Sequence, residues 1–180
     1  MDVIFRFRQK QSKFGFIVLI GLVFTFALPH ISDGGQFKVV RVYDGDTLKA
    51  QGYDIEIKVR LLGIDSPETQ RGKRKPGQPY SQKAKEFLTQ MVLNKVVEIK
   101  GYGLGPYNRT LGVVYLDGVN VNLEIVKAGL AEVYHGNSPR KFDIKPYLLA
   151  ESEAKNTERG MWFLGDRYIS PKDWRRFHKN

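Results

Sequence analysis

Three short runs of the sequence carry the side chains best suited to catalysis. The run at 59–69, VRLLGIDSPET, supplies one arginine and two carboxylates, and it is typical of a buried strand that leads into a polar turn. An earlier run at 43–47, YDGDT, adds two carboxylates, and a later one at 107–110, YNRT, adds a second arginine. Carboxylate oxygens can hold a hard metal ion, and the planar guanidinium of arginine binds phosphate. Together these residue types predict a site for phosphodiester chemistry.

Each run taken alone also has an ordinary structural interpretation. The run at 44–47 is typical of a hairpin turn, and it does not match the calcium-binding helix-loop-helix signature because Leu48 occupies the fifth position. The run at 65–68 suits a turn in which Asp65 accepts hydrogen bonds from nearby backbone amides. Arg109 alone suits a solvated strand. The three runs in combination are far more specific than any one of them.

The composition narrows the possible partners and chemistries. The 180 residues include 29 Lys and Arg against 19 Asp and Glu, a formal net charge of +10. This balance favours a polyanionic partner, nucleic acid or an anionic membrane, with a merely solvated basic surface as the alternative. The absence of cysteine excludes disulfides, thiolate zinc sites and cysteine nucleophiles. The three histidines are scattered along the chain, so we expect any catalytic base to be a carboxylate.

The N-terminal segment has the pattern of an export signal. Residues 1–13 are basic, and residues 14–28, FGFIVLIGLVFTFAL, carry no charge. Fifteen helical residues fall short of a bilayer core of about 30 Å, and Thr25-Phe26-Ala27 is a passable cleavage site. We therefore predict that residues 1–27 are a signal peptide or, alternatively, an uncleaved membrane anchor, followed by a linker at 28–35. Either outcome implies an exported protein, secreted, periplasmic or anchored with its catalytic domain outside the cytoplasm.

Alternating apolar residues and turn dipeptides predict five short strands. They are expected at 37–43, 47–51, 54–64, 96–100 and 111–116. In the third strand the apolar residues at 55, 57, 59 and 61 share one face, and Arg60 belongs to the polar face. A hairpin turn at 52–53 would put Arg60 roughly opposite residues 44–46, in a register that could slip by two residues. The glycine-rich stretch at 101–106 is predicted to be an ordinary loop.

Helical spacing and end signals predict about three helices. The first follows Ser81 as its N-cap and buries apolar residues as far as Val92, the second spans 121–128, and the third spans 146–159. The fold class is therefore mainly β with α: a five-stranded Greek-key barrel of the oligonucleotide-binding (OB) kind, preceded by the apolar N-terminal helix. We expect the barrel domain to span 36–164 and to be followed by a basic, aromatic tail at 165–180.

The chain resembles the thermonucleases, the staphylococcal-nuclease-like family, over roughly residues 36–162. Four motifs carry the resemblance in matching order and spacing: VYDGDT at 42–47, VRLLGIDSPET at 59–69, YNRTLG at 107–112, and DGVNVN with VKAGLA within 117–131. Three positions depart from the family pattern. Ser66 stands where threonine is common, the loop before Arg109 reads GPYN, and His135 replaces an aromatic residue that packs near the nucleotide.

The resemblance implies calcium-dependent hydrolysis of DNA and RNA by a five-stranded barrel with three helices. It implies that calcium is held by Asp46, Asp65 and the backbone carbonyl of Ser66, with the Asp44 carboxylate close behind these ligands. Such a ligand set consists only of hard oxygens, as calcium prefers, and leaves positions for water and substrate.

The resemblance also assigns the residues that act on the substrate. Glu68 matches the base for the attacking water, and Arg60 and Arg109 match two arginines that grip the reacting phosphate. Guanidinium groups aimed at the phosphate oxygens stabilise the extra negative charge of a phosphorane-like transition state.

Basic and aromatic residues outside these motifs are candidates for binding the substrate strand. Arg71, Lys73, Arg74 and Lys75 follow Glu68 directly, and a solvated loop is their alternative interpretation. We assign Tyr107 to substrate binding as well. The tail at 174–179, WRRFHK, could stack bases or touch lipid, or it could only pack Trp174 against the barrel.

Three classes of function are compatible with the sequence to different degrees. The first is a metal-dependent nuclease that acts on both sugars, with DNA and RNA as substrates, and we expect it to be a monomer. The second is a non-catalytic OB-fold module that only binds nucleic acid, which would have no need for the acidic residues. The third is a membrane-surface protein, which would explain the leader and the basic charge but not the acidic cluster.

Overall fold

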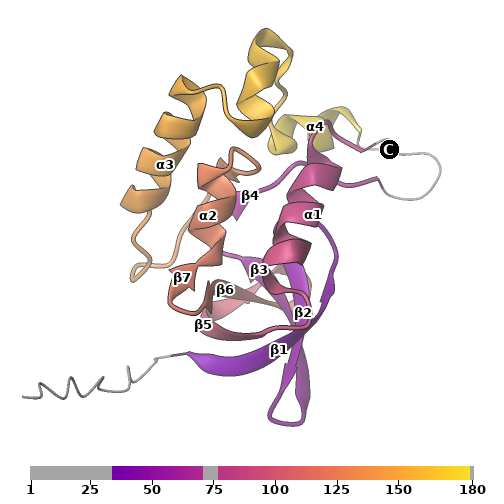
Figure 1. Ribbon diagram of the computed structural model, residues 1–180, viewed down its shortest axis with the longest axis vertical. Coiled ribbons are helices and arrows are strands. Elements are labelled where there is room, and N and C mark those ends of the chain that lie inside the picture. The colour runs from indigo at the N-terminus through magenta and orange to yellow at the C-terminus, as the bar shows by residue number, and fades with distance from the viewer. Residues whose placement is uncertain (1–33, 71–76, 179–180) are drawn as a thin grey trace, which may run out of the picture. The chain divides into compact units, whose positions relative to one another are not determined.

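Five strands close into a barrel in the computed structural model, which describes residues 34–70 and 77–178. The strands are β1 (Gly35–Val42), β2 (Thr47–Gly52), β3 (Ile55–Leu61), β5 (Val96–Gly105) and β6 (Arg109–Leu116). They pair in the order β3-β2-β1-β5-β6, and a parallel pairing of β3 with β6 closes the circle (Figure 1). The predicted five-stranded barrel is therefore confirmed.

The barrel interior is filled by apolar side chains that alternate along the strands. Val39 of β1, Leu48 of β2 and Val59 of β3 are completely buried. The alternation predicted for the third strand holds only toward its end, because Leu61 is 1% exposed whereas Ile55, next to the hairpin turn, is 52% exposed. The β2–β3 hairpin therefore extends beyond the core, and its buried end is the end that carries Arg60.

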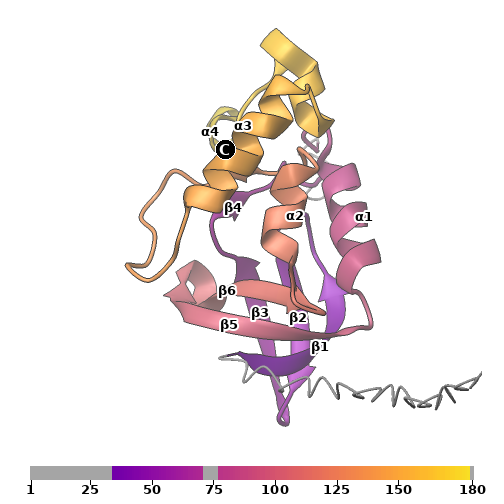
Figure 2. The same cartoon turned by 60° about the vertical axis from the view of Figure 1, so that its left-hand side comes forward.

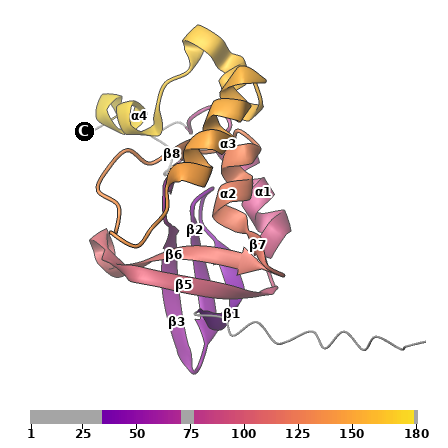
Figure 3. The same cartoon turned by 90° about the vertical axis from the view of Figure 1, so that its left-hand side faces the viewer.

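Helices cover one end of the barrel. The described α-helices are α1 (Ser81–Val92), α2 (Val121–Lys127), α3 (Lys145–Asn156) and α4 (Pro171–Phe177). Figures 2 and 3 show α1, α2 and α3 gathered at the end where β2 begins and β3 finishes. Leu88 of α1, Ile125 of α2 and Tyr147 of α3 join the strand residues in one hydrophobic core. The site described below lies at this same end, so packing of the helices fixes the barrel edge on which it is built.

The helix boundaries depart from the sequence prediction in two places. Ser81 was expected to cap α1, but it is the first helical residue, and the N-cap is Tyr80 in a left-handed conformation with φ of 67°. No side chain caps this end; instead the Ser81 N–H donates to the carbonyl of Gln78 at 3.1 Å. The helix expected at 146–159 spans Lys145–Asn156, because the chain turns before Gly160 and passes directly over Gly129.

Two segments for which the sequence predicted no helix or strand contain regular structure. The stretch expected as a loop at 101–106 continues β5 as far as Gly105, with an irregularity in its pairing with β6, and a single 3-10 turn, η1 (Pro106–Asn108), follows it. The tail forms a second 3-10 segment, η2 (Gly160–Arg167), and then helix α4. The fold prediction therefore missed α4, a helix that reaches the candidate site through Arg175.

Three very short strands complete the described structure. β7 (Val119–Asn120) extends the barrel sheet beside β6, and β4 (Ile64–Asp65) pairs with β8 (Glu132–Val133) outside it. Among the described residues no helix is both long and apolar enough to cross a membrane. The leader predicted at 1–27 and the apolar N-terminal helix lie outside the described residues.

Candidate active site

The turn between β1 and β2 places the first acidic residues. The Thr47 carbonyl accepts a hydrogen bond of 2.9 Å from the Tyr43 N–H, which closes a tight connection, and the Asp44 carboxylate accepts from the Asp46 N–H at 3.1 Å. Across the hairpin, Thr47 pairs with Arg60, and the Leu61 N–H donates to the Asp46 carbonyl at 2.8 Å. Arg60 was expected opposite residues 44–46, but it pairs with Thr47, one residue further along, because the β2–β3 turn lies at 53–54 rather than at 52–53.

The second acidic run is set in place by the sharp turn after β3. Gly63 adopts φ of +83°, and a Cβ at this position would lie only 2.4 Å from the Phe142 ring, so the chain can turn here only with glycine. Asp65 follows in β4, opposite Glu132 of β8. The next N–H, that of Ser66, donates to Oδ2 of Asp46 at 2.7 Å and joins the two acidic runs.

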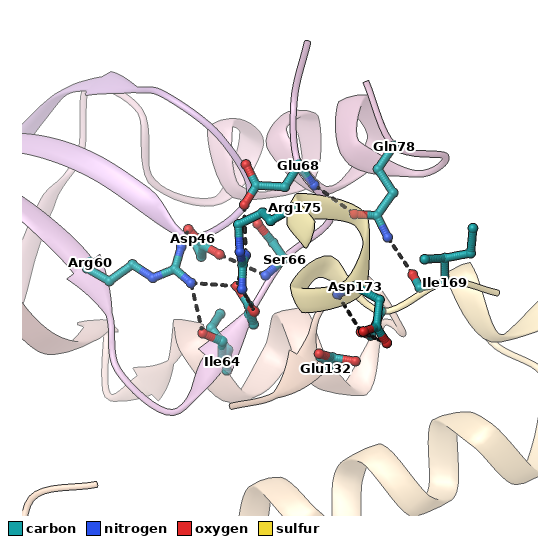
Figure 4. Close-up of polar contacts among 12 residues, drawn as sticks. Asp46, Arg60, Ile64, Ser66, Glu68, Gln78, Glu132, Ile169, Asp173 and Arg175 are labelled. Atoms are coloured by element: carbon teal, nitrogen blue, oxygen red, sulfur yellow. Dashed lines mark hydrogen bonds and ion pairs between the residues drawn. The ribbon is translucent and has the colours of Figure 1, made fainter. Parts of the chain in front are cut away.

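Arg60 links the two buried carboxylates. Asp46 and Asp65 are 1% and 2% exposed. One arm of the Arg60 guanidinium forms an ion pair with Oδ1 of Asp46, and the other reaches Oδ1 of Asp65 at 2.7 Å (Figure 4). Two carboxylates this deeply buried require a cationic partner, and the fork of Arg60 supplies one for both.

The charge of Arg60 favours the ionised form of the Asp46 carboxylate. Burial by itself would raise the pKa of Asp46, but the Arg60 charge and the Ser66 N–H outweigh it, and the net pKa is lowered. Burial would likewise lower the pKa of Arg60, and the charges of Asp46 and Asp65 raise it instead. In contrast, burial and the neighbouring Asp46 charge raise the pKa of Asp44 to about 7. Asp46 is thus held as an anion, whereas the Asp44 carboxyl group gains or loses its proton near neutral pH.

Glu68 is held by backbone bonds on the far side of the acidic runs. Its N–H donates to the Gln78 side-chain carbonyl at 3.1 Å, and its carbonyl accepts from the Gln78 N–H at 2.8 Å. The Gln78 side chain also donates to the carbonyl of Ile169 at 2.6 Å, which ties this strand end to the segment before α4. The Glu68 carboxylate, 18% exposed, is therefore presented from a fixed backbone.

Arg109 lines the same cavity as the acidic residues. Its Nε donates to the Pro106 carbonyl at 3.1 Å, and its guanidinium lies 5.7 Å from the centre of the Tyr107 ring. Tyr107 itself is 92% exposed, in a left-handed conformation with φ of 60°. Among the described residues, neither Arg109 nor Tyr107 contacts the carboxylates of the site. Their side chains can therefore contact a ligand that enters the cavity.

One cavity collects most of the predicted site residues. Its volume is about 520 Å³, and its wall includes predicted residues from all three sequence runs: Asp44, Asp46, Arg60, Ser66, Glu68, Tyr107 and Arg109. Asp65 contacts Arg60 just beneath this wall. The loop residues Arg71, Lys73, Arg74 and Lys75 lie outside the described residues. The convergence of the three runs is observed, while the roles assigned to the individual side chains stay predictions.

The donor set suits a hard cation in kind but contains only two buried carboxylates. Within residues 34–70 and 77–178, no three acidic or histidine side chains stand close enough to form a metal cluster by themselves. Asp46 and Asp65 contribute oxygen donors that calcium accepts, and a backbone carbonyl with water would have to supply the rest. The carboxylate oxygens of Asp46 and Asp65 therefore fit a hard cation such as calcium in chemical kind.

The structure adds one residue that the sequence analysis missed. Arg175 of α4 lines the same cavity and bonds to both Asp65 and Glu68. A sequence signal for the helix was present, since Ser170 precedes Pro171 as the N-cap, and its hydroxyl accepts a hydrogen bond of 3.0 Å from the Asp173 N–H. No signal indicated which basic residue of the tail would turn toward the carboxylates. Trp174, for which two roles were considered, stacks on His178 with ring centres 4.4 Å apart.

Comparison with known proteins places this site in a family. Residues 58–163 match the family described as staphylococcal nuclease homologue. A protein of Haemophilus influenzae named "Uncharacterized endonuclease" is 36% identical over 161 residues, which cover 88% of this chain and 83% of that protein. A protein of Escherichia coli with the same name is 32% identical over 156 residues, covering 86% of this chain and 94% of the relative.

A further relative is longer than the region that it shares with this chain. The "Probable endonuclease LCL3" of Komagataella phaffii is 37% identical over 129 residues, which cover 68% of this chain and 56% of that protein. The bacterial relatives match along most of their own length, so they provide the more complete comparison.

Proposed function

Because the chain belongs to the staphylococcal nuclease homologue family and is a nuclease, we propose that it hydrolyses the phosphodiester bonds of DNA and RNA in a calcium-dependent reaction. The observation that supports this proposal best is the single cavity lined by Asp46, Arg60, Glu68 and Arg109. A module that only binds nucleic acid would gain nothing from buried carboxylates, which repel a polyanion.

Calcium would be held by Asp46 and Asp65, two carboxylates already fixed by the Ser66 N–H and by Arg60. When bound there, the ion would lower the pKa of a coordinated water and neutralise charge on a phosphate oxygen. The Ser66 carbonyl and the Asp44 carboxylate are the proposed supports of this site. Because Asp46 lies in the turn before β2 and Asp65 lies in β4, the cation would also join these two segments.

The arginines would act on the phosphate. Arg60 rises from a strand end between the two metal ligands, so a phosphodiester that approaches the ligands must also approach its guanidinium. Arg109, the first residue of β6, lines the same cavity, and its Nε donates to the Pro106 carbonyl. Guanidinium donors on two sides of the phosphorus stabilise the oxygens most when negative charge grows on them in the transition state.

Glu68 would take a proton from the attacking water. Its backbone is fixed by Gln78, and its carboxylate borders the cavity without being one of the proposed ligands. A carboxylate in this place can accept the proton as the oxygen attacks phosphorus, provided that the water lies within hydrogen-bond reach. The leaving oxygen would then be protonated from solvent, since the cavity is open to it.

Digestion of plasmid DNA and of RNA tests the proposal directly. The full chain is incubated with each substrate in calcium, in magnesium and in excess chelator, and the products are followed on gels. We expect both substrates to be cut with calcium and neither with chelator. Tight binding of either nucleic acid without cleavage, across several divalent ions, would favour the non-catalytic module instead. We further propose, from the apolar segment at 14–28, that the enzyme acts outside the cytoplasm.

A further inference from the structure

Arg175 makes the most extensive side-chain contact between the C-terminal helix and the candidate site. Its Nη1 and Nη2 donate to Oδ1 and Oδ2 of Asp65 at 3.0 and 2.7 Å, a paired contact that uses both carboxylate oxygens. Its Nη1 also donates to Oε1 of Glu68 at 2.8 Å. One side chain therefore occupies a proposed metal ligand and the proposed base together. Figure 4 shows Arg175 reaching from α4 toward Glu68, while Arg60 approaches from the strand side.

These contacts leave little of Asp65 for another cation. Oδ1 accepts from both Arg60 and Arg175, and Oδ2 accepts from Arg175. Calcium binds carboxylate oxygens at about 2.3–2.6 Å, so an ion on Asp65 would lie next to the Arg175 guanidinium, a like charge. A carboxylate oxygen has only two lone-pair positions, which Oδ1 already uses. Calcium and Arg175 therefore compete for the same oxygens.

The helix that carries Arg175 is weakly held apart from this contact. It has seven residues, of which only Pro171 is buried, and a helix this short has little stability of its own. Phe177 is 62% exposed, and the neighbouring Arg176 side chain is 71% exposed. The bonds of Arg175 to Asp65 and Glu68 are thus a large part of what keeps α4 against the site.

The segment before α4 is, by contrast, firmly attached. The Ile169 carbonyl accepts from Gln78 at 2.6 Å, the Tyr168 hydroxyl donates to Glu132, and the Tyr168 ring packs against Trp162 with ring centres 4.6 Å apart. Removal of Arg175 from the site would leave these contacts intact. It would also leave Asp65 paired with Arg60, so no buried carboxylate would lose its only partner.

We propose that α4 is a C-terminal latch: Arg175 closes the site by occupying Asp65 and Glu68, and calcium opens it by displacing this arginine. The latch rests on the proposed function, since it assumes that Asp65 holds the cation. It sets the calcium concentration at which the enzyme becomes active, because the ion must replace two charge-assisted contacts before Glu68 is released. Displacement pivots on residues 168–170, whose anchors lie outside the cavity.

Calcium binding by the full chain tests the latch without reference to activity. Isothermal titration with calcium is carried out on the wild type, on Arg175→Ala, and on Arg176→Ala as the matched control. Arg176 carries the same charge on the same helix. Its side chain forms an ion pair with Asp173 at 3.5 Å, on α4 itself. We expect Arg175→Ala to lower the calcium Kd about tenfold and Arg176→Ala to leave it within about twofold. An unchanged or higher Kd in Arg175→Ala would overturn the latch.

Turnover at two calcium concentrations separates a latch from a catalytic arginine. Below the wild-type Kd, Arg175→Ala should cut plasmid DNA faster than the wild type, and at saturating calcium the two rates should converge. A loss of turnover in Arg175→Ala at saturating calcium would show that Arg175 serves the reaction itself, and the latch would be wrong. If no variant binds calcium and none cleaves, the proposed function fails; if all bind and cleave alike, only the latch fails.

The movement of α4 can be followed through Trp174. The chain has two tryptophans, so a Trp162→Phe background leaves Trp174 as the single emitter. Calcium should shift its emission in this background, and the same shift should be present before calcium in the variant that also carries Arg175→Ala. Identical emission with and without calcium, in a protein shown by titration to bind it, would contradict displacement of the helix.

Discussion

Arg60 and Arg175 bond to the same carboxylate but are presented by very different parts of the molecule. Arg60 stands on β3, between pairing partners in β2 and β6, and its side chain is 19% exposed. Arg175 stands on a seven-residue helix of which only Pro171 is buried, and its own side chain is 38% exposed. An arginine fixed by a barrel can be part of the reaction geometry, whereas one on a loosely packed helix can be exchanged. We therefore assign Arg60 to the proposed reaction and Arg175 to its proposed control by calcium.

The largest expected effect comes from removing the strand-borne arginine. Arg60→Ala should lower kcat by at least about 10³-fold, since the transition state loses a guanidinium that stabilises charge on the phosphate oxygens. It should also lower the free energy of unfolding by about 3 kcal/mol, because Asp46 loses its cationic partner. Steady-state kinetics and urea denaturation measure the two effects. Recovery of full activity in Arg60→Lys, which lacks the fork, would contradict the assigned role.

The next effect concerns the base that Arg175 covers. Glu68→Gln keeps the size of the side chain but removes its capacity to accept a proton, and we expect turnover to fall about 10²–10⁴-fold at saturating calcium. Glu56→Gln is the matched control, because Glu56 lies on β3 in an exposed ion pair with Lys49. A well-folded Glu68→Gln variant with wild-type turnover would show that Glu68 is not the base. The only site residue blocked by Arg175 would then be Asp65, the proposed metal ligand.

A smaller effect on stability is expected at Glu132, which bonds to Tyr168 in the segment before α4. Burial raises the pKa of Glu132 to about 7, helped by the Asp65 and Glu151 charges and opposed by its bond from Tyr168. The folded chain therefore binds this proton more tightly than the unfolded chain, so wild-type stability from this group is lost as pH rises from about 4.5 to about 7. Glu132→Gln should remove a loss on the order of 1 kcal/mol across that window.

Denaturation in chelator at pH 4.5 and pH 8 measures this difference, with Glu153→Gln as a control on the exposed face of α3, where its side chain is 67% exposed. Equal pH dependence in Glu132→Gln and in the wild type would show that the buried carboxylate does not titrate as described. The root of α4 would then be held by something other than the bond between Tyr168 and Glu132.

The smallest effect is the stability change on removing the helix-borne arginine. Arg175→Ala should lower the unfolding free energy by less than about 1 kcal/mol, because a partly exposed ion pair contributes little and Asp65 keeps Arg60. Urea denaturation in chelator measures it beside Arg60→Ala. A loss as large as that of Arg60→Ala would mean that α4 is an integral part of the fold, and the contrast between the two arginines would disappear.

The sequence was sufficient for the barrel and for the strand-borne part of the site. Local patterns specify both, because alternating apolar residues define the buried end of β3, and a tight hairpin brings Arg60 beside the acidic turn, with a pairing to Thr47 that lies one residue beyond the predicted range. Asp46, Arg60, Glu68 and Arg109 could therefore be predicted to converge, and they line one cavity. The same local patterns explain the error at Ser81, since a serine before an apolar helix face usually caps it, whereas here the turn begins three residues earlier at Gln78.

Arg175 could not be found in this way because its role depends on a contact 110 residues distant in sequence. The tail contains several basic residues in succession, and nothing in their order distinguishes the one that turns inward. That choice follows from the path of residues 160–170, which is set by the docking of Met161 onto Gly129 and of Ile169 onto Gln78. Long-range packing of this kind is not encoded in any short motif.

A crystal structure of the full chain with calcium and a non-hydrolysable thymidine dinucleotide tests the whole account most directly. We predict calcium on oxygens of Asp46 and Asp65, the phosphate between Arg60 and Arg109, and Arg175 withdrawn from Asp65 with α4 displaced. Calcium bound elsewhere, or a phosphate that contacts neither strand-borne arginine, would contradict the proposed site. Calcium on Asp65 with Arg175 still bonded to both of its oxygens would contradict the latch alone.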